Sequence, residues 1–97
     1  MTDPNLAEAL GQNPLIIDVR TPEEFATGTV PGAINIPSHL IPLRLEEIPK
    51  DKPVIVFCQS GSRSGLTKQF LLHEGYTNCV NGGAMANVLH ELEQNSN

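Results

Sequence analysis

The sequence has little of several residue types that define particular protein classes. It contains only two cysteines, Cys58 and Cys79, and no tryptophan. Two cysteines are too few for a disulfide scaffold, and they lack the C-x-x-C spacing of a thioredoxin-type couple or a zinc knuckle. The three histidines show no ligand spacing with one another or with either cysteine. We therefore expect no metal site, and a reducing cytoplasm is the default compartment.

Basic residues and long apolar runs are also scarce. Six Lys and Arg stand against 11 Asp and Glu, which gives a net charge of −5. Duplex binding needs clustered basic residues, so we expect no nucleic-acid partner. No apolar run reaches the roughly 18 residues of a transmembrane helix, and the polar start of the chain does not resemble a secretory signal. We therefore expect no membrane association, and an anionic ligand must bind at a local positive site.

What is present is the composition of one globular domain. The chain has 97 residues, of which 39% are hydrophobic and 18% charged. This length and balance fit a single domain and exclude an intrinsically disordered chain. Both ends are polar, so we expect the domain to span residues 5–94, with flexible termini at 1–4 and 95–97.

Short apolar runs alternate with amphipathic segments along the chain. The apolar runs predict strands at 15–19, 33–36, 53–57 and 76–81. Helical patterns lie at 5–10, 21–28, 38–48, 63–74 and 84–93. Each connection between strands is too long for a hairpin and long enough for a crossover. The pattern predicts an α/β fold with a central, largely parallel sheet flanked by helices on both faces.

Local signals indicate where some of these elements begin and end. Asn5 is expected to cap the first helix, and Thr21 the second. Gly82-Gly83 predicts a tight turn after the last strand. The helix at 63–74 has an apolar face that we expect to consist of Leu66, Phe70 and Leu71.

The segment with the clearest chemical signal begins where the strand at 53–57 ends. Cys58 lies there, at the mouth of a short loop of small and polar residues, and a helix opens near Arg63. If the loop curls around the sulfur, the N–H groups of residues 59–64 form an anion nest. The helix start directs its positive end to the same place. Both effects favour the thiolate, which is the nucleophilic form of cysteine.

The glycine, the serines and the arginine of the loop suit this chemistry. Gly61 permits a positive φ where the loop turns back. Ser60, Ser62 and Ser64 can donate hydroxyl hydrogen bonds inward, and Arg63 adds a permanent charge that could meet a sulfonate or phosphate. The alternative, an inert buried cysteine followed by an ordinary turn, fits less well with a loop that opens a helix.

The segment Cys58-Gln59-Ser60-Gly61-Ser62-Arg63-Ser64 resembles the active-site loop of the single-domain rhodaneses, which are sulfurtransferases. The likeness runs from Leu15 to about Leu92. Residues 17–25 are similar to the first strand and helix start of that family, and residues 28–37 to its G-H-I-P-G-A-x-N-I-P segment. The resemblance implies a rhodanese-like fold.

The resemblance also implies a reaction and the residues that perform it. Cys58 would take sulfane sulfur from a small anionic donor, such as thiosulfate or a persulfide, and carry it as a cysteine persulfide. A thiol, cyanide or a protein acceptor would then remove it, without a metal or organic cofactor. The implied substrate-binding loop consists of Gln59, Ser60, Gly61, Ser62 and Arg63. Because its first two residues are uncharged where strong thiosulfate users often carry basic residues, a persulfide donor is favoured.

Two other functions stay open. The first is a small phosphatase or an arsenate-type reductase. Four residues lie between Cys58 and Arg63, one fewer than in the related cysteine-dependent phosphatases. Those enzymes also usually place a histidine before the cysteine, where Phe57 stands here. A non-catalytic rhodanese-like binding or redox-sensing module is the second alternative, although such modules usually lose the cysteine.

Three further residues near the strand ends invite a structural interpretation. Asp18 is expected to cap backbone N–H groups, and Arg20 to pair with Glu23 or Glu24. The alternative is that these two residues line the mouth of the site. Cys79 is expected to be a small core hydrophobe. Its alternative role, resolving an oxidised Cys58, would need the two sulfurs to be close.

Overall fold

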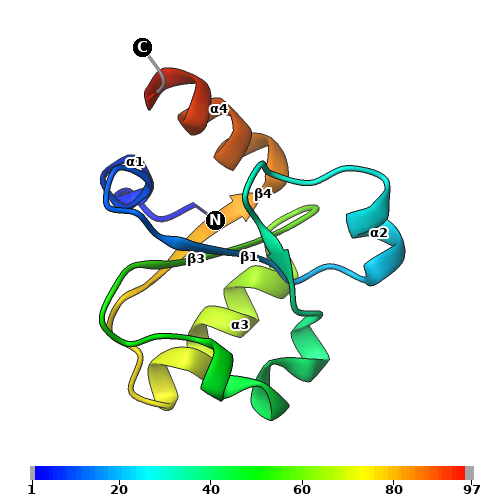
Figure 1. Ribbon diagram of the computed structural model, residues 1–97, viewed down its shortest axis with the longest axis vertical. Coiled ribbons are helices and arrows are strands. Elements are labelled where there is room, and N and C mark those ends of the chain that lie inside the picture. The colour runs from blue at the N-terminus through cyan, green and yellow to red at the C-terminus, as the bar shows by residue number, and fades with distance from the viewer. Residues whose placement is uncertain (1, 96–97) are drawn as a thin grey trace.

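A computed structural model describes residues 2–95 of the chain (Figure 1). In this part of the chain, helices and strands alternate in the order α1 (Leu6–Leu10), β1 (Leu15–Asp18), α2 (Pro22–Ala26), β2 (Ile34–Asn35), β3 (Val54–Cys58), α3 (Ser62–His73), β4 (Cys79–Ala84) and α4 (Met85–Asn95). Between β2 and β3 lie two short 3₁₀ helices, η1 (Ser38–Leu43) and η2 (Leu45–Glu47). The predicted helical stretch at 38–48 is therefore irregular, with Pro42 inside it.

The four strands form one parallel sheet in the order β2-β1-β3-β4. The predicted α/β fold is thus confirmed, and the crossovers between parallel strands are its helices. Asp18, the last residue of β1, pairs with Phe57 near the end of β3. The carboxyl ends of the two central strands therefore meet at one edge, where ligands of such sheets bind.

Helices cover both faces of the sheet, as predicted. Figure 1 shows α1 and α4 on one side of the strands and α3 with the 3₁₀ helices on the other. In β3 the side chains of Val54, Val56 and Cys58 pack on the α3 side, whereas Ile55 and Phe57 pack on the α1 and α4 side. All five are fully buried. This central strand is held from both faces, so it positions Cys58 rigidly.

The two glycines expected in a tight turn lie instead inside β4, opposite an irregularity in the register between Val56 and Phe57. A Cβ atom at Gly82 would lie 2.6 Å from Val88 Cγ2 and 3.3 Å from the Val56 carbonyl oxygen. Gly83 has a φ of 72°. The glycines therefore permit α4 to cross close to β4, a requirement that local turn statistics do not reveal.

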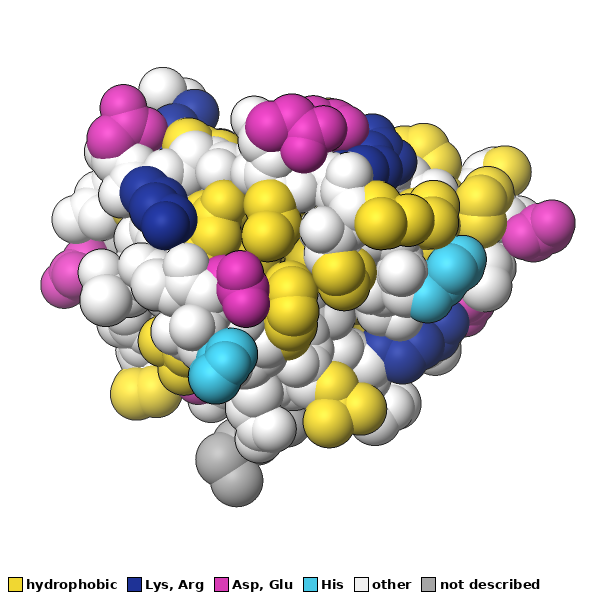
Figure 2. All heavy atoms as spheres, turned by 90° about the horizontal axis from the view of Figure 1, so that it is seen from below, with side chains coloured by type: hydrophobic (Ala, Val, Ile, Leu, Met, Phe, Trp, Pro, Cys, Tyr) yellow, Lys and Arg dark blue, Asp and Glu magenta, His cyan; other side chains and the backbone are white. Residues whose placement is uncertain are grey.

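The apolar face of α3 also differs from the expectation, because the side chain of Leu66 is 69% exposed. The buried positions of this helix are Ser64, Thr67 and Leu71. Ser64 packs toward the end of β3, so the helix turns two small polar residues, Ser64 and Thr67, toward the sheet. Figure 2 shows apolar side chains gathered on the face that α3 forms with the 3₁₀ helices.

The caps of the first two helices behave differently. Thr21 caps α2, since its hydroxyl accepts from the Glu24 N–H at 3.2 Å and the Glu24 carboxylate accepts from the Thr21 N–H at 3.1 Å. Asn5 precedes α1 but makes no side-chain cap hydrogen bond. A Glu follows three residues after each of the two caps, Glu8 after Asn5 and Glu24 after Thr21, but the reciprocal capping box forms at Thr21.

Flexible termini are expected at 1–4 and 95–97, and residues 1 and 96–97 of these lie outside the described residues. The Asp3 N–H donates to the Asn81 carbonyl at 2.8 Å, its carboxylate accepts from the Asn81 N–H at 3.0 Å, and it pairs with Lys68. These contacts lie along the outer edge of β4.

Between residues 2 and 95, none of the helices combines the length and apolar character needed to span a bilayer.

The packing of α4 on β4 predicts that Gly82→Ala destabilises the fold. Val88 is fully buried and its β-branched side chain is stiff, so the added methyl group cannot be accommodated without displacing the helix. We expect the free energy of unfolding, measured by urea denaturation, to fall by about 1–3 kcal/mol. Gly11→Ala is the control, because Gly11 has a φ of −81° and its nearest neighbour lies at 3.5 Å. Equal midpoints for both variants would contradict this description of the packing.

Candidate active site

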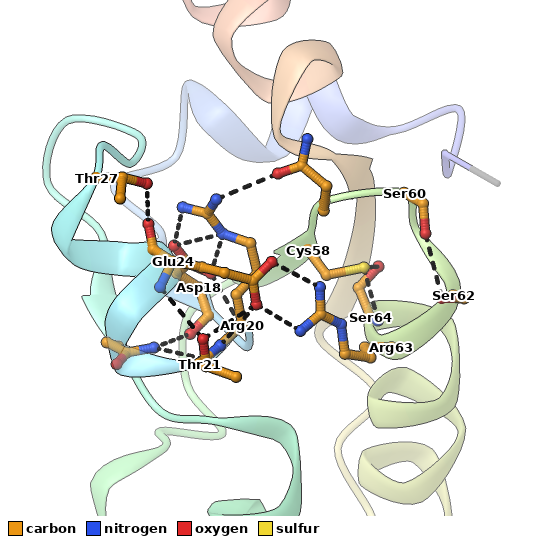
Figure 3. A network of polar contacts seen from close by, with 12 residues as sticks. Asp18, Arg20, Thr21, Glu24, Thr27, Cys58, Ser60, Ser62, Arg63 and Ser64 are labelled. Carbon is orange, nitrogen blue, oxygen red and sulfur yellow. Dashed lines mark hydrogen bonds and ion pairs between the residues drawn. The ribbon is translucent and has the colours of Figure 1, made fainter.

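The sulfur of Cys58 lies at the carboxyl end of β3, enclosed by the loop that leads into α3 (Figure 3). The Gly61 N–H donates to Sγ at 3.0 Å and the Ser64 N–H at 3.4 Å. Gly61 has a φ of 98°, the left-handed conformation predicted for this position, and it turns the chain back around the sulfur. The Ser64 N–H belongs to the first turn of α3, whose N–H groups have no partner within the helix.

The Ser64 side chain completes the surroundings of the sulfur. Its Oγ lies 3.7 Å from Sγ, 3.1 Å from the Gly61 carbonyl oxygen and 3.4 Å from the Gly83 carbonyl oxygen. A protonated Cys58 donates its thiol hydrogen to this oxygen. Once the thiol has ionised, the hydroxyl can donate to the sulfur instead. Ser64 is fully buried, so this exchange takes place away from water.

These contacts decide the charge state of Cys58. Burial alone raises the pKa of the thiol, but hydrogen bonds from Ser64, Gly61 and Ser60 outweigh it and hold the pKa below its ordinary value. The positive end of α3 acts in the same direction. The loop therefore favours the thiolate, which is the reactive form of cysteine.

The loop closes over Cys58 and does not leave it at an open mouth. The side chain of Cys58 has no exposed surface, whereas Gln59, Ser60 and Ser62 above it are exposed. A reagent therefore reaches the sulfur only when these loop residues move.

The sequence predicts that all three serines of the loop point toward the sulfur, but Ser60 and Ser62 do not. The hydroxyls of Ser60 and Ser62 lie 3.2 Å from each other on the outer side of the loop. Only Ser64 places its hydroxyl on the sulfur side. The difference follows from the helical spacing, since Ser64 lies on the buried face of α3 and Ser62 at its exposed start.

A buried ion pair supports the loop from the neighbouring strand β1. Arg20 Nη2 lies 2.7 Å from Asp18 Oδ2, and the exposed fractions of the two side chains are 3% and 0%. Asp18 accepts from the Arg20 N–H at 3.0 Å, as expected of a backbone cap. The prediction for Arg20 was wrong, because Arg20 pairs with Asp18 and not with Glu23 or Glu24. Hydrogen bonding to Asp18 raises the pKa of Arg20.

This pair also reaches the loop after Cys58 and the turn after α2. Arg20 Nη1 donates to Gln59 Oε1 at 3.3 Å, and Nη2 donates to the Gly28 carbonyl at 2.6 Å. The Thr29 hydroxyl donates to Asp18 Oδ2 at 2.9 Å. The side-chain oxygen of Gln59 therefore accepts a hydrogen bond from Arg20, and this contact connects the end of β1 to the loop.

Arg63 lies between Cys58 and α2, with its guanidinium bound to Glu24 (Figure 3). Nη1 donates to Glu24 Oε1 at 2.7 Å and Nη2 to Oε2 at 3.1 Å. The pKa of Arg63 is raised, chiefly by Glu24 and to a smaller extent by the Cys58 sulfur. Arg63 lowers the pKa of Glu24 to about 2.

Sequence reasoning did not identify Glu24 as a residue of this site. Its place three residues after Thr21 marks it as a helix-capping residue, and the structure agrees. Its contact with Arg63 joins residues 39 positions apart. No local pattern predicts such a pair.

The second cysteine lies at the far end of the sheet. Cys79 pairs with Val54 at the start of β3, whereas Cys58 ends that strand beside Ala84. Four residues of strand, at about 3.3 Å each, separate the two positions, well beyond the roughly 7 Å between Cα atoms that a disulfide tolerates. Burial raises the pKa of Cys79 to about 12. Cys79 is a core residue, and its alternative role in resolving an oxidised Cys58 is excluded.

One cavity adjoins the loop after Cys58, and a larger one lies away from it. One of about 360 Å³ lies at the other end of the sheet, around Lys52, Asn78 and Cys79. Another of about 270 Å³ adjoins Arg63 and has an apolar lining that includes Leu66 and Phe70. Within residues 2–95, no three His, Cys, Asp or Glu side chains are grouped so that they could hold a metal ion.

Comparisons with known proteins agree on one family. The family model described as rhodanese-like domain matches residues 2–86. A sulfurtransferase of Allochromatium vinosum is 45% identical over 80 residues, covering 80% of this chain and 75% of the relative. The thiosulfate sulfurtransferase PspE of Escherichia coli is 39% identical over 74 residues, covering 74% and 71%. The human single-domain sulfurtransferase TSTD1 has a TM-score of 0.71 and 32% identity, covering 93% of this chain and 94% of that one. These comparisons support a sulfurtransferase activity in general terms.

The contact of Ser64 with the sulfur predicts that Ser64→Ala raises the pKa of Cys58. The variant keeps the backbone N–H groups but loses the hydroxyl, and one hydrogen bond to a charged group is worth about tenfold in an equilibrium. We expect alkylation of Cys58 by iodoacetamide at neutral pH to slow about tenfold, with its pH–rate profile moved upward. Ser62→Ala is the matched control, because that hydroxyl bonds to Ser60. Similar profiles for the two variants would show that Ser64 does not stabilise the thiolate.

The separation of the two cysteines predicts a single reactive thiol in the folded protein. Intact-mass spectrometry after alkylation without denaturant should find one alkyl group on the wild type and on Cys79→Ala, and none on Cys58→Ser. Cys79 stays unlabelled because it is buried and protonated. A second label on the wild type would contradict the position assigned to Cys79.

Proposed function

The chain belongs to the rhodanese-like domain family, and we propose that it transfers sulfane sulfur through a persulfide formed on Cys58. The observation that supports this most is the set of hydrogen bonds that converge on Sγ from Gly61 and Ser64. They favour a thiolate at the end of a rigid, buried strand. Relatives named as sulfurtransferases support the same class of reaction.

In the first half of the proposed reaction, the Cys58 thiolate attacks the outer sulfur of the donor. A new S–S bond forms to Cys58 while the S–S bond of the donor breaks. Thiosulfate leaves as sulfite and a persulfide leaves as a thiolate, in each case with the electron pair of the broken bond. The charge of the cysteine is the same before and after, since the thiolate becomes a persulfide anion. The N–H groups of the loop stabilise both anions.

In the second half, an acceptor attacks the outer sulfur of the Cys58 persulfide. Cyanide leaves as thiocyanate and a thiolate leaves as a persulfide, and Cys58 returns to its thiolate form. The same hydrogen bonds that lower the pKa of Cys58 make it a good leaving group. The substrate-binding loop in this proposal consists of Gln59, Ser60, Gly61, Ser62 and Arg63.

The full burial of Cys58 adds a step to this scheme. In this proposal the exposed loop residues Gln59, Ser60 and Ser62 have to move before a donor can approach Sγ. The same burial is the one observation that favours the alternative function, a non-catalytic binding or redox-sensing module. The lowered pKa of the thiol favours catalysis, because an inert structural cysteine needs no such stabilisation.

We assign the reaction to a reducing compartment such as the cytoplasm. Both cysteines are free thiols, and a persulfide enzyme needs its cysteine reduced at the start of each cycle. The acceptor in this proposal is a small thiol, cyanide or a protein thiol.

The proposal predicts that Cys58→Ser loses sulfur transfer while remaining folded. We expect kcat/KM for thiocyanate formation from thiosulfate and cyanide to fall by at least about a thousandfold, because a serine hydroxyl is not ionised in this loop. Intact-mass spectrometry of the wild type after incubation with a sulfane donor should find a gain of one sulfur atom that added thiols remove. Cys79→Ala is the control and should behave as the wild type. The absence of turnover and of the adduct with thiosulfate and with cysteine persulfide would refute the proposed function.

A further inference from the structure

We propose that Glu24 is a specificity-determining residue of this site, because its carboxylate occupies the face of Arg63 that the sulfonate of thiosulfate would need. The site would then prefer singly charged persulfide donors to the doubly charged thiosulfate ion. This inference rests on the proposed sulfur transfer at Cys58 and names its substrate class.

The Arg63–Glu24 pair takes up the fork formed by the two terminal nitrogens of the guanidinium. Both terminal nitrogens of Arg63 donate to the carboxylate, at 2.7 and 3.1 Å, in a two-point pair. A planar guanidinium binds a carboxylate or a sulfonate through the same fork of parallel N–H groups. Glu24 and a sulfonate are therefore competitors for one surface of Arg63.

Glu24 does not reach Arg63 as a freely rotating surface side chain. Its carboxylate also accepts from the N–H and the hydroxyl of Thr21, at 3.1 and 3.3 Å, while its own N–H donates to the Thr21 hydroxyl. This capping box fixes the direction of the side chain at the start of α2. A substrate that displaces the carboxylate from Arg63 must also disturb the cap of α2.

The other cations of the chain do not replace Arg63. Each of the three arginines is paired with a carboxylate, and the pairs are Arg20–Asp18, Arg44–Glu47 and Arg63–Glu24. Lys68 is paired with Asp3, and Lys50 and Lys52 line the cavity at the other end of the sheet. Within residues 2–95, the positive character at Cys58 therefore comes from backbone N–H groups and the start of α3, together with arginines whose charge is already matched.

This arrangement distinguishes donors by their charge. The two arginines near the loop and their two carboxylates cancel, so the Cys58 thiolate leaves the site with a net negative charge. A doubly charged ion is repelled twice as strongly as a singly charged one at the same distance. Because Glu24 has a pKa of about 2, it keeps its charge at the working pH of the protein. Backbone N–H groups remain sufficient for the single charge of a persulfide.

The inference predicts that Glu24→Gln shifts donor preference toward thiosulfate. The amide oxygen of Gln can still accept from the Thr21 N–H, so the cap is kept while the charge on Arg63 is no longer matched. The experiment measures kcat/KM for thiosulfate from thiocyanate formation. It measures the rate at which cysteine persulfide loads Cys58 by intact-mass spectrometry. The ratio of thiosulfate to persulfide use should rise at least about fivefold, and added salt should reduce the gain.

Two further variants separate this effect from a general change of charge. Glu23→Gln removes the same charge from the same helix at an exposed position that makes no ion pair within residues 2–95, and it should change the ratio less than about twofold. Adding Arg63→Gln to Glu24→Gln should abolish the gain, because the gain depends on the freed guanidinium. If Glu24→Gln unfolds in urea more readily than the wild type, Thr21→Ala serves as a further control, because it weakens the cap but keeps the charge of Glu24, and it should leave the ratio unchanged.

The outcomes distinguish the two proposals. An unchanged ratio in Glu24→Gln, or an equal change in Glu23→Gln, overturns the role of Glu24 while a Cys58 persulfide in the wild type leaves the proposed function standing. Failure of every variant to form the persulfide with either donor overturns the proposed function, and the role of Glu24 with it. A rise in the ratio that depends on Arg63 supports both.

Discussion

The stabilisation of one buried sulfur by hydrogen bonds is the constraint on which the rest of this site depends. Cys58 is removed from water at the end of a strand packed on both faces. In such a place the thiolate is stable only if N–H and O–H groups replace the lost water. The loop provides them from Gly61 and Ser64, and the start of α3 adds its dipole. The residues around the loop, such as the Asp18–Arg20 pair that contacts Gln59, hold these donors in position around the sulfur.

The surrounding charges are arranged in matched pairs. The buried Asp18–Arg20 pair connects β1 to Gln59 in the loop, and Arg63 is matched by a carboxylate from α2. Breaking a buried pair by removing one partner leaves an uncompensated charge, so the Asp18–Arg20 contact serves as a rigid support more than as a source of binding energy. The consequence for chemistry is that the immediate environment of the sulfur is dominated by dipoles. This arrangement is the basis of the proposed preference for singly charged persulfide donors.

Features that depend on neighbours along the chain were predictable. The Thr21 capping box, the left-handed Gly61 and the position of Cys58 at a strand end each arise from interactions spanning only a few residues. The alternation of apolar and amphipathic segments likewise predicted a parallel sheet, since such crossovers leave few other topologies. The exposure of Leu66 and the inclusion of Gly82 in β4 were not predictable, because both follow from how α3 and α4 cross the sheet.

The sequence by itself determined the order of the elements, the single cysteine before a loop of small residues, and the opening of a helix directly after it. These depend on short-range steric and hydrogen-bonding preferences. Only the tertiary structure decided that Ser64 is the serine that contacts the sulfur, that Glu24 matches Arg63, and that Cys79 lies at the opposite end of the sheet. Such pairings join distant segments, and the register of the strands and the angles at which helices pack on them determine which side chains meet.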